Sequence, residues 1–191
     1  MKRLLILDNR DSFSYNLRHL FLKINDVEVI VVPTAESATI DFEDIDGLIL
    51  SPGPGLPDDH PGLAWSIAQA ENRMPILGVC LGLQAIGEYY GGQLHRLETV
   101  RHGKISQVHI TEKTGLWVDC ESPFTVGRYH SYVLNAQNLP ASLNVTSQDN
   151  NDEIMGIRHA SLPIYGVQFH PESYMTTNGI QIAQNFVDII E

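Results

Sequence analysis

Four short runs of mainly apolar residues mark the first 80 positions of the chain. They cover residues 4–7, 27–32, 48–50 and 76–79. Runs without a regular alternation of polar residues are typical of parallel strands that are buried on both faces. We therefore predict a central sheet built from these four segments.

Amphipathic helices are predicted between and after these runs. Behind Asp11 and Ser12, either of which could cap a helix, apolar residues recur at helical spacing. They are Phe13, Leu17, Leu20, Phe21 and Ile24. Two more helices are expected over residues 61–73 and 81–90, the first with a proline near its first turn and the second ending at two glycines. A last helix carries one apolar face, made of Ile180, Ala183, Phe186, Val187 and Ile190.

The helical spacing fades between residues 93 and 166, and strand-like segments replace it. We expect strands over residues 105–110, 143–147, 154–158 and 164–169. No repeat, low-complexity segment or linker divides the chain. The predicted fold is therefore one α/β domain over residues 1–191. It has a mostly parallel central sheet with helices on both faces, and a smaller mixed or antiparallel β region in the second half.

Composition and charge narrow the possible functions. The chain has 191 residues, of which 43% are hydrophobic and 18% charged, which excludes a disordered protein. Twelve Lys and Arg against 23 Asp and Glu give a formal net charge of -11, so no nucleic-acid partner is expected. Acidic residues are denser at 41–46 and 149–153, and we interpret both stretches as solvated loops.

The cysteines and the N-terminal segment bear on where the protein works. Cys80 and Cys120 lie in dissimilar surroundings and do not suggest a disulfide framework, so a reducing cytoplasm is expected. The first apolar run, residues 4–7, is too short for a signal peptide or a membrane span. We therefore expect no association with a membrane.

The sharpest candidate for chemistry is Gly78-Val79-Cys80-Leu81-Gly82, which follows an apolar strand and leads into a helix. Glycines on either side of Cys80 permit the strained turn of a nucleophile elbow, which lifts the side chain above the sheet. A helix N-terminus favours the thiolate, and the backbone N–H of Leu81 would point toward a developing oxyanion. For this segment alone, the alternative is a small buried cysteine without a chemical role.

A thiol nucleophile needs a base, and the base needs an orienting group. Among eight histidines, His170 fits best, because it follows a strand-like segment and begins His170-Pro171-Glu172. The carboxyl ends of parallel strands meet at one edge of a sheet, so His170 can reach Cys80. Pro171 stiffens the link and lets Glu172 be held against the other imidazole nitrogen. By itself this tripeptide suggests only a turn, but with the cysteine elbow it predicts a Cys-His-Glu triad.

The loop Ser51-Pro52-Gly53-Pro54-Gly55 directly follows the third apolar run. Prolines fix its backbone, and glycines let that backbone approach a ligand closely. Gly53, Pro54 and Gly55 are therefore candidates for donating amides to an oxyanion or to the main-chain groups of a substrate. An ordinary tight turn is the alternative. The loop lacks the glycine spacing and the Lys-Ser/Thr ending of a phosphate-binding loop.

Three segments, taken together and in this order, resemble the class I, or triad, glutamine amidotransferases. They are residues 53–55, 78–84 and 166–172, and their spacing fits that family over the whole chain. Residues 8–17, 102–104 and 128–131 look like one branch of it, component II of anthranilate synthase and its relative in aminodeoxychorismate synthase.

The resemblance implies a flavodoxin-like fold for the catalytic half and an oxyanion hole made by the amides of Gly53 and Leu81. It also implies that Gln84 and the backbone at Ser131 and Tyr132 hold the amino-acid end of L-glutamine. Ammonia would pass to a larger synthase subunit that aminates chorismate, which is the expected partner. No cofactor is implied, and no Cys/His spacing forms a zinc site, so no metal is expected.

Three residues depart from the pattern of these relatives: Leu83 where histidine is frequent, Tyr132 where leucine is frequent, and Arg10 where an aromatic residue is usual. None belongs to the triad. Two alternatives stay open, a γ-glutamyl or peptide hydrolase that works without a synthase and a noncatalytic α/β regulatory module. The residues above serve glutamine, so they do not decide between tryptophan and folate synthesis.

Overall fold

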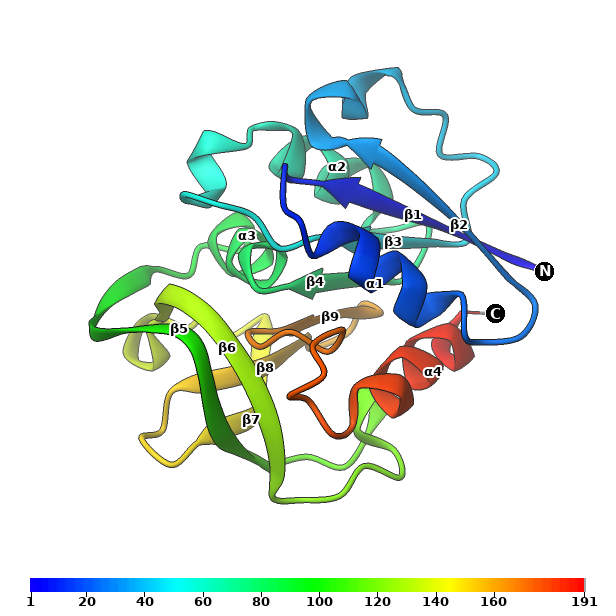
Figure 1. Ribbon diagram of the computed structural model, residues 1–191. Coiled ribbons are helices and arrows are strands. Elements are labelled where there is room, and N and C mark those ends of the chain that lie inside the picture. The colour runs from blue at the N-terminus through cyan, green and yellow to red at the C-terminus, as the bar shows by residue number, and fades with distance from the viewer. Residues whose placement is uncertain (191) are drawn as a thin grey trace.

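The computed structural model describes residues 1–190, in which nine strands form one twisted sheet between two layers of helices (Figure 1). The strands are β1 Lys2–Asp8, β2 Val27–Pro33, β3 Gly47–Leu50, β4 Ile76–Val79, β5 Leu94–Ile110, β6 Phe124–Leu134, β7 Leu143–Asp149, β8 Ile154–His159 and β9 Ile164–Val167. Their order across the sheet is β2-β1-β3-β4-β9-β8-β7-β5-β6.

The first five strands in this order are parallel, as the apolar runs predicted. β9 comes from the second half of the chain and joins this parallel part beside β4. The register pairs Val79 with Val167 at the ends of these two strands. Cys80 and Gln168 therefore leave the sheet side by side, and His170 follows two residues later.

The helices cover both faces of the sheet, which confirms the predicted layers. They are α1 Ser14–Phe21, α2 Gly62–Ala70, α3 Leu81–Tyr89 and α4 Gly179–Ile189, with short 3-10 turns η1 Thr34–Thr39, η2 Pro57–Asp59, η3 Gly115–Trp117 and η4 Ala136–Asn138. One buried cluster joins the sheet to α1 and α4, through Leu17, Phe21, Ile182 and Phe186. A second cluster on the opposite face joins it to α2 and α3, through Leu63, Ile67, Leu83 and Ile86.

Two features of the predicted helices differ from the structure, the cap of α1 and the apolar face of α4. α1 begins at Ser14 without a side-chain cap, although Asp11 Oδ1 accepts a hydrogen bond from the Phe13 amide at 2.7 Å. In α4 the predicted apolar face was wrong at Ile180, which is 47% exposed, whereas Ile182 is fully buried. The helix packs on two sides, against the sheet and against α1, so its buried stripe is wider than the pattern indicated.

The second half of the chain extends the same sheet by antiparallel pairing of β9, β8, β7, β5 and β6. β5 is much longer than the predicted segment 105–110, and β6 was not predicted as a strand. The pattern of polar and apolar residues does not indicate β6, because Arg128 and His130 are polar yet occupy buried positions in it. The strand runs beside the segment that follows β9, since Gly127 forms an antiparallel bridge with His170.

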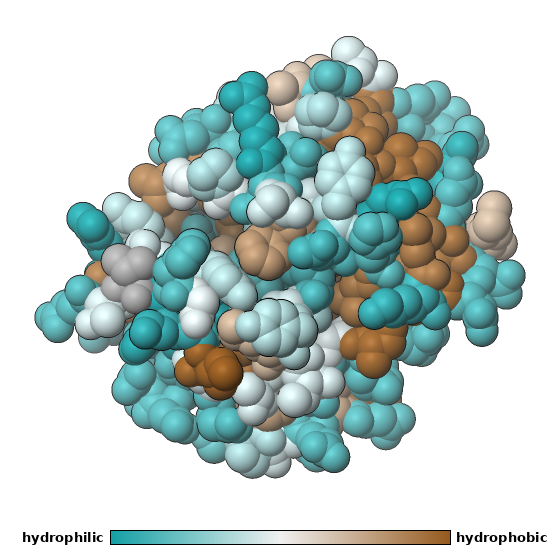
Figure 2. All heavy atoms as spheres, viewed as in Figure 1, coloured by the Kyte–Doolittle hydropathy of each residue, from teal (hydrophilic) through white to brown (hydrophobic). Residues whose placement is uncertain are grey.

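The surface is predominantly hydrophilic, with one side that is more apolar. Figure 2 shows hydrophobic atoms gathered toward the side formed by the edge strand β2. On that strand Val27, Ile30, Val31 and Val32 are only half buried. Within residues 1–190, no helix is both long enough and apolar enough to cross a bilayer.

The burial of α4 leads to a test with two isoleucines of one helix. Ile182→Ala should lower the free energy of unfolding by about 2–5 kcal/mol, because it leaves a cavity in a packed core. Ile180→Ala should change it by less than about 0.5 kcal/mol, as expected of a surface position. Urea unfolding followed by circular dichroism measures both, and equal losses would contradict the placement of this helix.

Candidate active site

Cys80 occupies the sharp turn between β4 and α3, as the glycine pattern predicted. Its backbone has φ 54° and ψ -101°, a strained conformation for a residue with a side chain. A Cβ on Gly78 would lie 2.5 Å from backbone atoms of Gly82, and a Cβ on Gly82 would overlap the carbonyl of Leu50. Only glycine on either side lets α3 approach the sheet so closely, and this approach holds Cys80 at the top of the turn.

His170 and Glu172 come together beside this turn. Nδ1 of His170 lies 2.6 Å from Oε1 of Glu172, and both side chains are buried. Burial alone would lower the pKa of His170, but the Glu172 carboxylate and the Cys80 sulfur outweigh it and hold that pKa well above its usual value. The Nε2 atom has no hydrogen-bond partner among the described residues. The imidazole therefore has one nitrogen fixed by a carboxylate and one available on the side of the sulfur.

Two aromatic side chains hold the imidazole from distant parts of the chain. The ring centroids of Phe13 and Tyr129 lie 5.0 and 4.9 Å from that of His170, with the rings edge to face. Phe13 and Tyr129 also contact each other at 5.0 Å. Both residues lie in segments that resemble the family, but the sequence does not indicate that they contact His170. Their positions limit rotation of the imidazole and cover it from solvent.

Asn9, which is fully buried, fixes the loop of residues 51–55 that follows β3. Its side-chain amide donates to the Ser51 carbonyl at 2.8 Å, and its oxygen accepts from Thr34 at 2.7 Å. A Cβ on Gly53 would lie 2.6 Å from both Asn9 and Leu81, so a larger residue would displace the loop. Gly53 thus lies directly against Leu81, whose amide is in the first turn of α3 and cannot bond within the helix.

A cavity of about 420 Å³ opens above Cys80, within the usual size range of a small-molecule site. All the predicted substrate-binding residues border it together with Cys80: Gly53, Pro54, Gly55, Gln84, Ser131 and Tyr132. Leu81, His170 and Glu172 are not part of its lining. Leu56, Asp59, Tyr129 and His130 complete the lining and were not predicted. Gly55 has φ +78°, and a Cβ there would clash with the Asp59 carboxylate, which in turn accepts from the Leu56 amide.

Of the three departures from the family pattern, only Tyr132 borders this cavity. Leu83 is fully buried in α3 and packs toward Gly166 of β9. Arg10 has φ 61° and borders a neighbouring hollow of about 650 Å³ with Asp8 and His60. Tyr132 contributes through its carbonyl oxygen, which accepts from the Gln84 amide at 2.9 Å.

A buried ion cluster lies next to His130 of the cavity lining, and it corrects the interpretation of residues 149–153 as a solvated loop at Asp149 and Glu153. The three residues between them are exposed, as predicted. The guanidinium of Arg128 is fully buried and donates to Asp149 at 2.6 Å and to Glu153. Burial opposes ionisation of Asp149, but backbone amides and Arg128 outweigh it and lower its pKa. The acidic stretch is therefore dense in charge because it neutralises an arginine inside the protein, which local composition does not reveal.

Arg128 also fixes the protonation of His130, because an arginine can only donate. Its Nε donates to Nε2 of His130 at 3.0 Å, so the imidazole hydrogen is on Nδ1, which donates to the Tyr132 carbonyl at 3.0 Å. Burial, reinforced by the charge of Arg128, lowers the pKa of His130 to about 3. His130 is therefore neutral at physiological pH.

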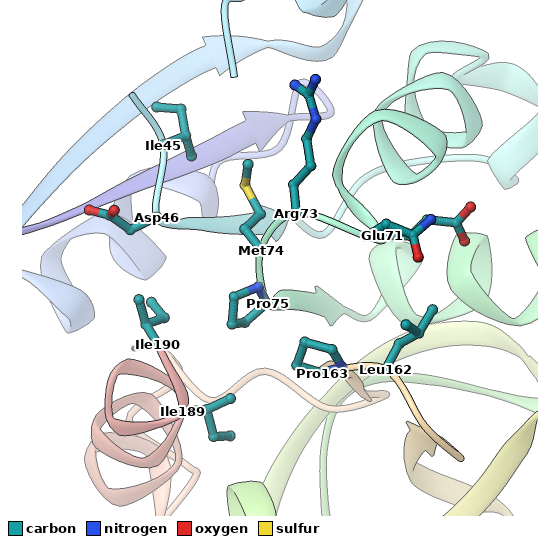
Figure 3. Close-up of a pocket in the computed structure, with 11 residues that line it drawn as sticks. Ile45, Asp46, Glu71, Arg73, Met74, Pro75, Leu162, Pro163, Ile189 and Ile190 are labelled. Carbon is teal, nitrogen blue, oxygen red and sulfur yellow. The ribbon is translucent and has the colours of Figure 1, made fainter. Parts of the chain in front are cut away.

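Another hollow, of about 460 Å³, lies at the opposite edge of the parallel strands (Figure 3). Loop residues before β3, β4 and β9 line it, together with the end of α4, for example Asp46, Pro75, Pro163 and Ile190. Open α/β sheets bind their ligands at the carboxyl ends of their strands, where Cys80 and His170 lie, and not at this edge.

Within residues 1–190, no group of three or more His, Cys, Asp or Glu side chains is arranged to hold a metal ion.

Comparisons with known proteins cover nearly the whole chain. The model of the family described as glutamine amidotransferase class-I matches residues 5–190. Aminodeoxychorismate/anthranilate synthase component 2 of Bacillus subtilis is 41% identical over 188 residues, covering 97% of this chain and 95% of the relative. Anthranilate synthase component 2 of Pseudomonas aeruginosa is 40% identical over 191 residues, covering 96% and 94%. A solved structure described as a GMP synthase protein from Thermoplasma acidophilum superposes with a TM-score of 0.89 at 25% identity, covering 100% and 94%.

The low pKa of His130 predicts how stability depends on pH. An unfolded histidine titrates near about 6.5, so between that value and about 3 the unfolded state binds the extra proton. His130 should therefore lower the free energy of unfolding as the pH falls through this window, by up to about 1.4 kcal/mol per pH unit. His130→Gln should make the slope shallower in urea unfolding between about pH 7.5 and 4.5.

His109→Gln, at an exposed position of β5, is the matched control and should reproduce the wild-type slope. Parallel stability curves for the wild type and His130→Gln would contradict a buried neutral His130.

Proposed function

The chain belongs to the class I glutamine amidotransferases, and on that premise we propose that Cys80, His170 and Glu172 hydrolyse L-glutamine to glutamate and ammonia. The observation that carries this assignment is the meeting of an elbow cysteine, which borders a cavity of about 420 Å³, with a buried histidine-glutamate pair. Nothing else in residues 1–190 combines a strained cysteine with such a pair.

The first half-reaction forms a thioester. A cationic imidazole beside a cysteine sulfur stabilises the thiolate, which attacks the side-chain carbonyl carbon of glutamine. The carbonyl oxygen becomes an oxyanion, which the amides of Gly53 and Leu81 would receive. His170 then gives its proton to the nitrogen, the carbon–nitrogen bond breaks, and ammonia leaves.

The second half-reaction returns the enzyme to its starting state. His170, now neutral, takes a proton from water, whose oxygen attacks the thioester carbon. The carbon–sulfur bond breaks, glutamate leaves, and the sulfur is again a thiolate beside a cationic imidazole. Glu172 stays ionised throughout and orients the imidazole through the 2.6 Å contact.

The same proposal assigns the amino-acid end of glutamine to Gln84 and the backbone at Ser131 and Tyr132. These residues border the same cavity as the loop Gly53-Pro54-Gly55. Hydrolysis by a cysteine requires a free thiol, so we place the reaction in a reducing compartment such as the cytoplasm.

In this proposal the ammonia passes to a second subunit. Both relatives described above carry the name component 2 of a synthase, one of anthranilate synthase and one of aminodeoxychorismate/anthranilate synthase. We infer that this chain is likewise the glutaminase component of a larger complex, and that its partner is a subunit that aminates chorismate. Mixing the chain with a candidate synthase subunit, glutamine and chorismate, and identifying the aromatic product, tests this assignment and its pathway.

The two free cysteines predict opposite outcomes of the same substitution. In the complex, Cys80→Ser should reduce glutamine-dependent synthesis by about a thousandfold or more, while synthesis from ammonium salts continues. Cys120→Ser should leave both activities intact, because burial and then Asp119 raise the pKa of Cys120 to about 11 and keep this thiol protonated. Equal losses from the two changes would overturn the assignment of the nucleophile.

Glutaminase activity should depend on the partner, because hydrolysis without an acceptor wastes ammonia. Addition of the synthase subunit with chorismate should raise kcat/KM for glutamine by about a hundredfold, equivalent to roughly 2.7 kcal/mol of coupling. The loop of residues 51–57 is the expected moving part, since rotation of one peptide there gives or removes an oxyanion donor. Equal values for the chain alone, with partner, and with partner plus chorismate would favour a stand-alone hydrolase.

A further inference from the structure

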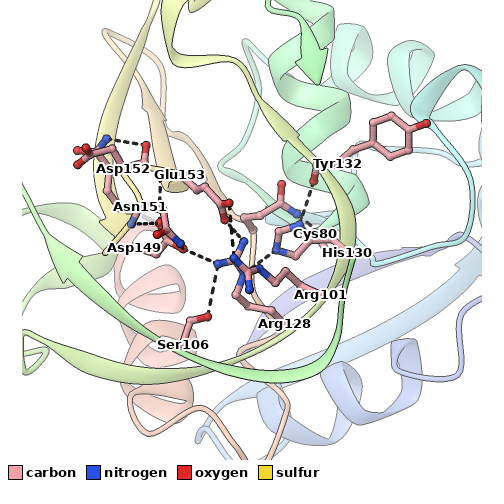
Figure 4. A network of polar contacts seen from close by, with 12 residues as sticks. Cys80, Arg101, Ser106, Arg128, His130, Tyr132, Asp149, Asn151, Asp152 and Glu153 are labelled. Atoms are coloured by element: carbon pink, nitrogen blue, oxygen red, sulfur yellow. Dashed lines mark hydrogen bonds and ion pairs between the residues drawn. The ribbon is translucent and has the colours of Figure 1, made fainter. Parts of the chain in front are cut away.

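A continuous chain of hydrogen bonds joins the buried ion cluster to the sulfur of Cys80, and Figure 4 shows its part from the ion cluster to Tyr132. Arg128 bonds to His130, and His130 bonds to the Tyr132 carbonyl. The amide of Gln84 bonds to the same carbonyl at 2.9 Å and to Oε1 of Gln168 at 3.2 Å. The amide nitrogen of Gln168 then donates to Cys80 Sγ at 3.7 Å.

The direction of every bond in this chain is fixed by two groups, Arg128 and the Tyr132 carbonyl. Arg128 can only donate and a backbone carbonyl can only accept, so His130 carries its hydrogen on Nδ1. The carbonyl of Tyr132 requires the nitrogen of the Gln84 carboxamide, not its oxygen. That nitrogen also donates to Gln168, so Gln168 presents its oxygen to Gln84 and its nitrogen to the sulfur.

Gln168 is held in this orientation with no freedom to turn. It is fully buried at the end of β9, and its own amide donates to the Met155 carbonyl at 3.0 Å. Reversal of its carboxamide would bring two N–H groups together at Gln84 and an oxygen to the sulfur. Both contacts would leave buried polar groups unsatisfied, which costs more than a single hydrogen bond contributes.

We propose that Gln168 is a further catalytic residue, which donates a hydrogen bond to the attacking sulfur of Cys80 and is held in the donating orientation by Gln84. Tyr132, His130 and Arg128 are positioning residues that act through Gln84. This inference rests on the proposed function insofar as Cys80 is the nucleophile. It adds to the triad a donor that none of the triad roles requires.

The chemical effect of this donor follows from the charge on the sulfur. A hydrogen bond to an ionised group is stronger than one to a neutral group, so an amide aimed at the sulfur favours thiolate over thiol. It also fixes the direction from which the sulfur attacks. Both amide hydrogens of Gln84 are used within the protein, which leaves only its oxygen to bind a ligand in the cavity. The side chain of Gln84, through its bond to Gln168, thus connects the nucleophile to the part of the cavity assigned to the amino-acid end of glutamine.

Two substitutions at Gln168 separate the donor from the shape of the side chain. Gln168→Glu keeps the shape and an acceptor for Gln84 but replaces the donor with a carboxylate oxygen, whereas Gln168→Met removes both polar contacts. Alkylation of Cys80 by iodoacetamide is measured against pH, with Cys120→Ser in every protein. We expect the rate near pH 7 to fall at least about tenfold in Gln168→Met and further in Gln168→Glu, with the midpoint moved to higher pH.

Gln107→Met is the matched control, because Gln107 bonds to Thr125 at an exposed position of β5. Its rate and midpoint should equal those of the parent protein. Thermal unfolding is measured for every variant, since a purely structural Gln168 would lower stability without moving the midpoint of alkylation. An unchanged midpoint in folded Gln168→Glu would overturn the proposal.

A pair of substitutions at His130 tests the positioning residues. Asparagine can replace the Nδ1 donor to Tyr132, whereas glutamine resembles the Nε2 side of the ring and loses that donor. In the complex with its synthase partner, His130→Gln should raise KM for glutamine several-fold with kcat changed less, and His130→Asn should restore KM toward the parent value. Equal KM values in all three proteins would overturn this part of the proposal.

The alkylation assay needs neither glutamine nor a partner, so it separates the two levels of inference. If the complex releases no ammonia from glutamine although alkylation depends on Gln168, the proposed function fails and the hydrogen bond to the sulfur stands. If glutamine is hydrolysed through Cys80 while the Gln168 variants alkylate like the parent, the further inference fails alone.

Discussion

The close approach of helix α3 to strands β3 and β4 is the constraint on which the rest of the site depends. Gly78 and Gly82 permit that approach, since a side chain at either position would meet backbone atoms of the elbow or of β3. The approach forces Cys80 into a positive φ, which raises its side chain above the sheet. A conformation of this kind costs about 1–3 kcal/mol and persists only where the surroundings determine it. Here the buried strands and helices on both faces of the sheet supply that determination.

Around this rigid turn, the groups that surround the sulfur come from well separated parts of the chain. His170 and Gln168 come from β9 and the segment after it, because β9 is inserted next to β4 in the sheet. Phe13 from the start of α1 and Tyr129 from β6 hold the imidazole between them. Asn9, after β1, fixes the loop that carries Gly53. Cys80, Gln168 and Asn9 directly follow strand ends, and Tyr129 lies within β6, so the accuracy of the site derives largely from the sheet.

The antiparallel half of the sheet contains a group of buried charges whose desolvation opposes folding. Arg128 is fully buried with Asp149 and Glu153, and desolvation of such charges is compensated only when every partner is in place. Apolar residues of similar size would give comparable stability with less risk of a buried unpaired charge. What the ion cluster provides in addition is direction at His130, because an arginine can only donate and so fixes the tautomer that donates to the Tyr132 carbonyl. That carbonyl can only accept, and it fixes the hydrogen-bond polarity from Gln84 to Cys80. A hydrophobic core cannot orient a carboxamide.

The sequence by itself determined the parts of this protein that depend on neighbouring residues. Buried parallel strands, the elbow at Cys80 and the stiff His170-Pro171-Glu172 turn are local patterns, since apolar runs, flanking glycines and a proline act over a few positions. Only the tertiary structure decided the strand character of β6, the burial of the Asp149 and Glu153 side chains, the orientation of Ile180 and Ile182, and the contacts of Asn9, Phe13 and Gln168. These depend on which strands are neighbours and in what register, as in the pairing of Val79 with Val167 across 88 positions. A polar residue such as Arg128 or Gln168 looks exposed from its sequence because its partners, which alone make its burial favourable, lie far away along the chain.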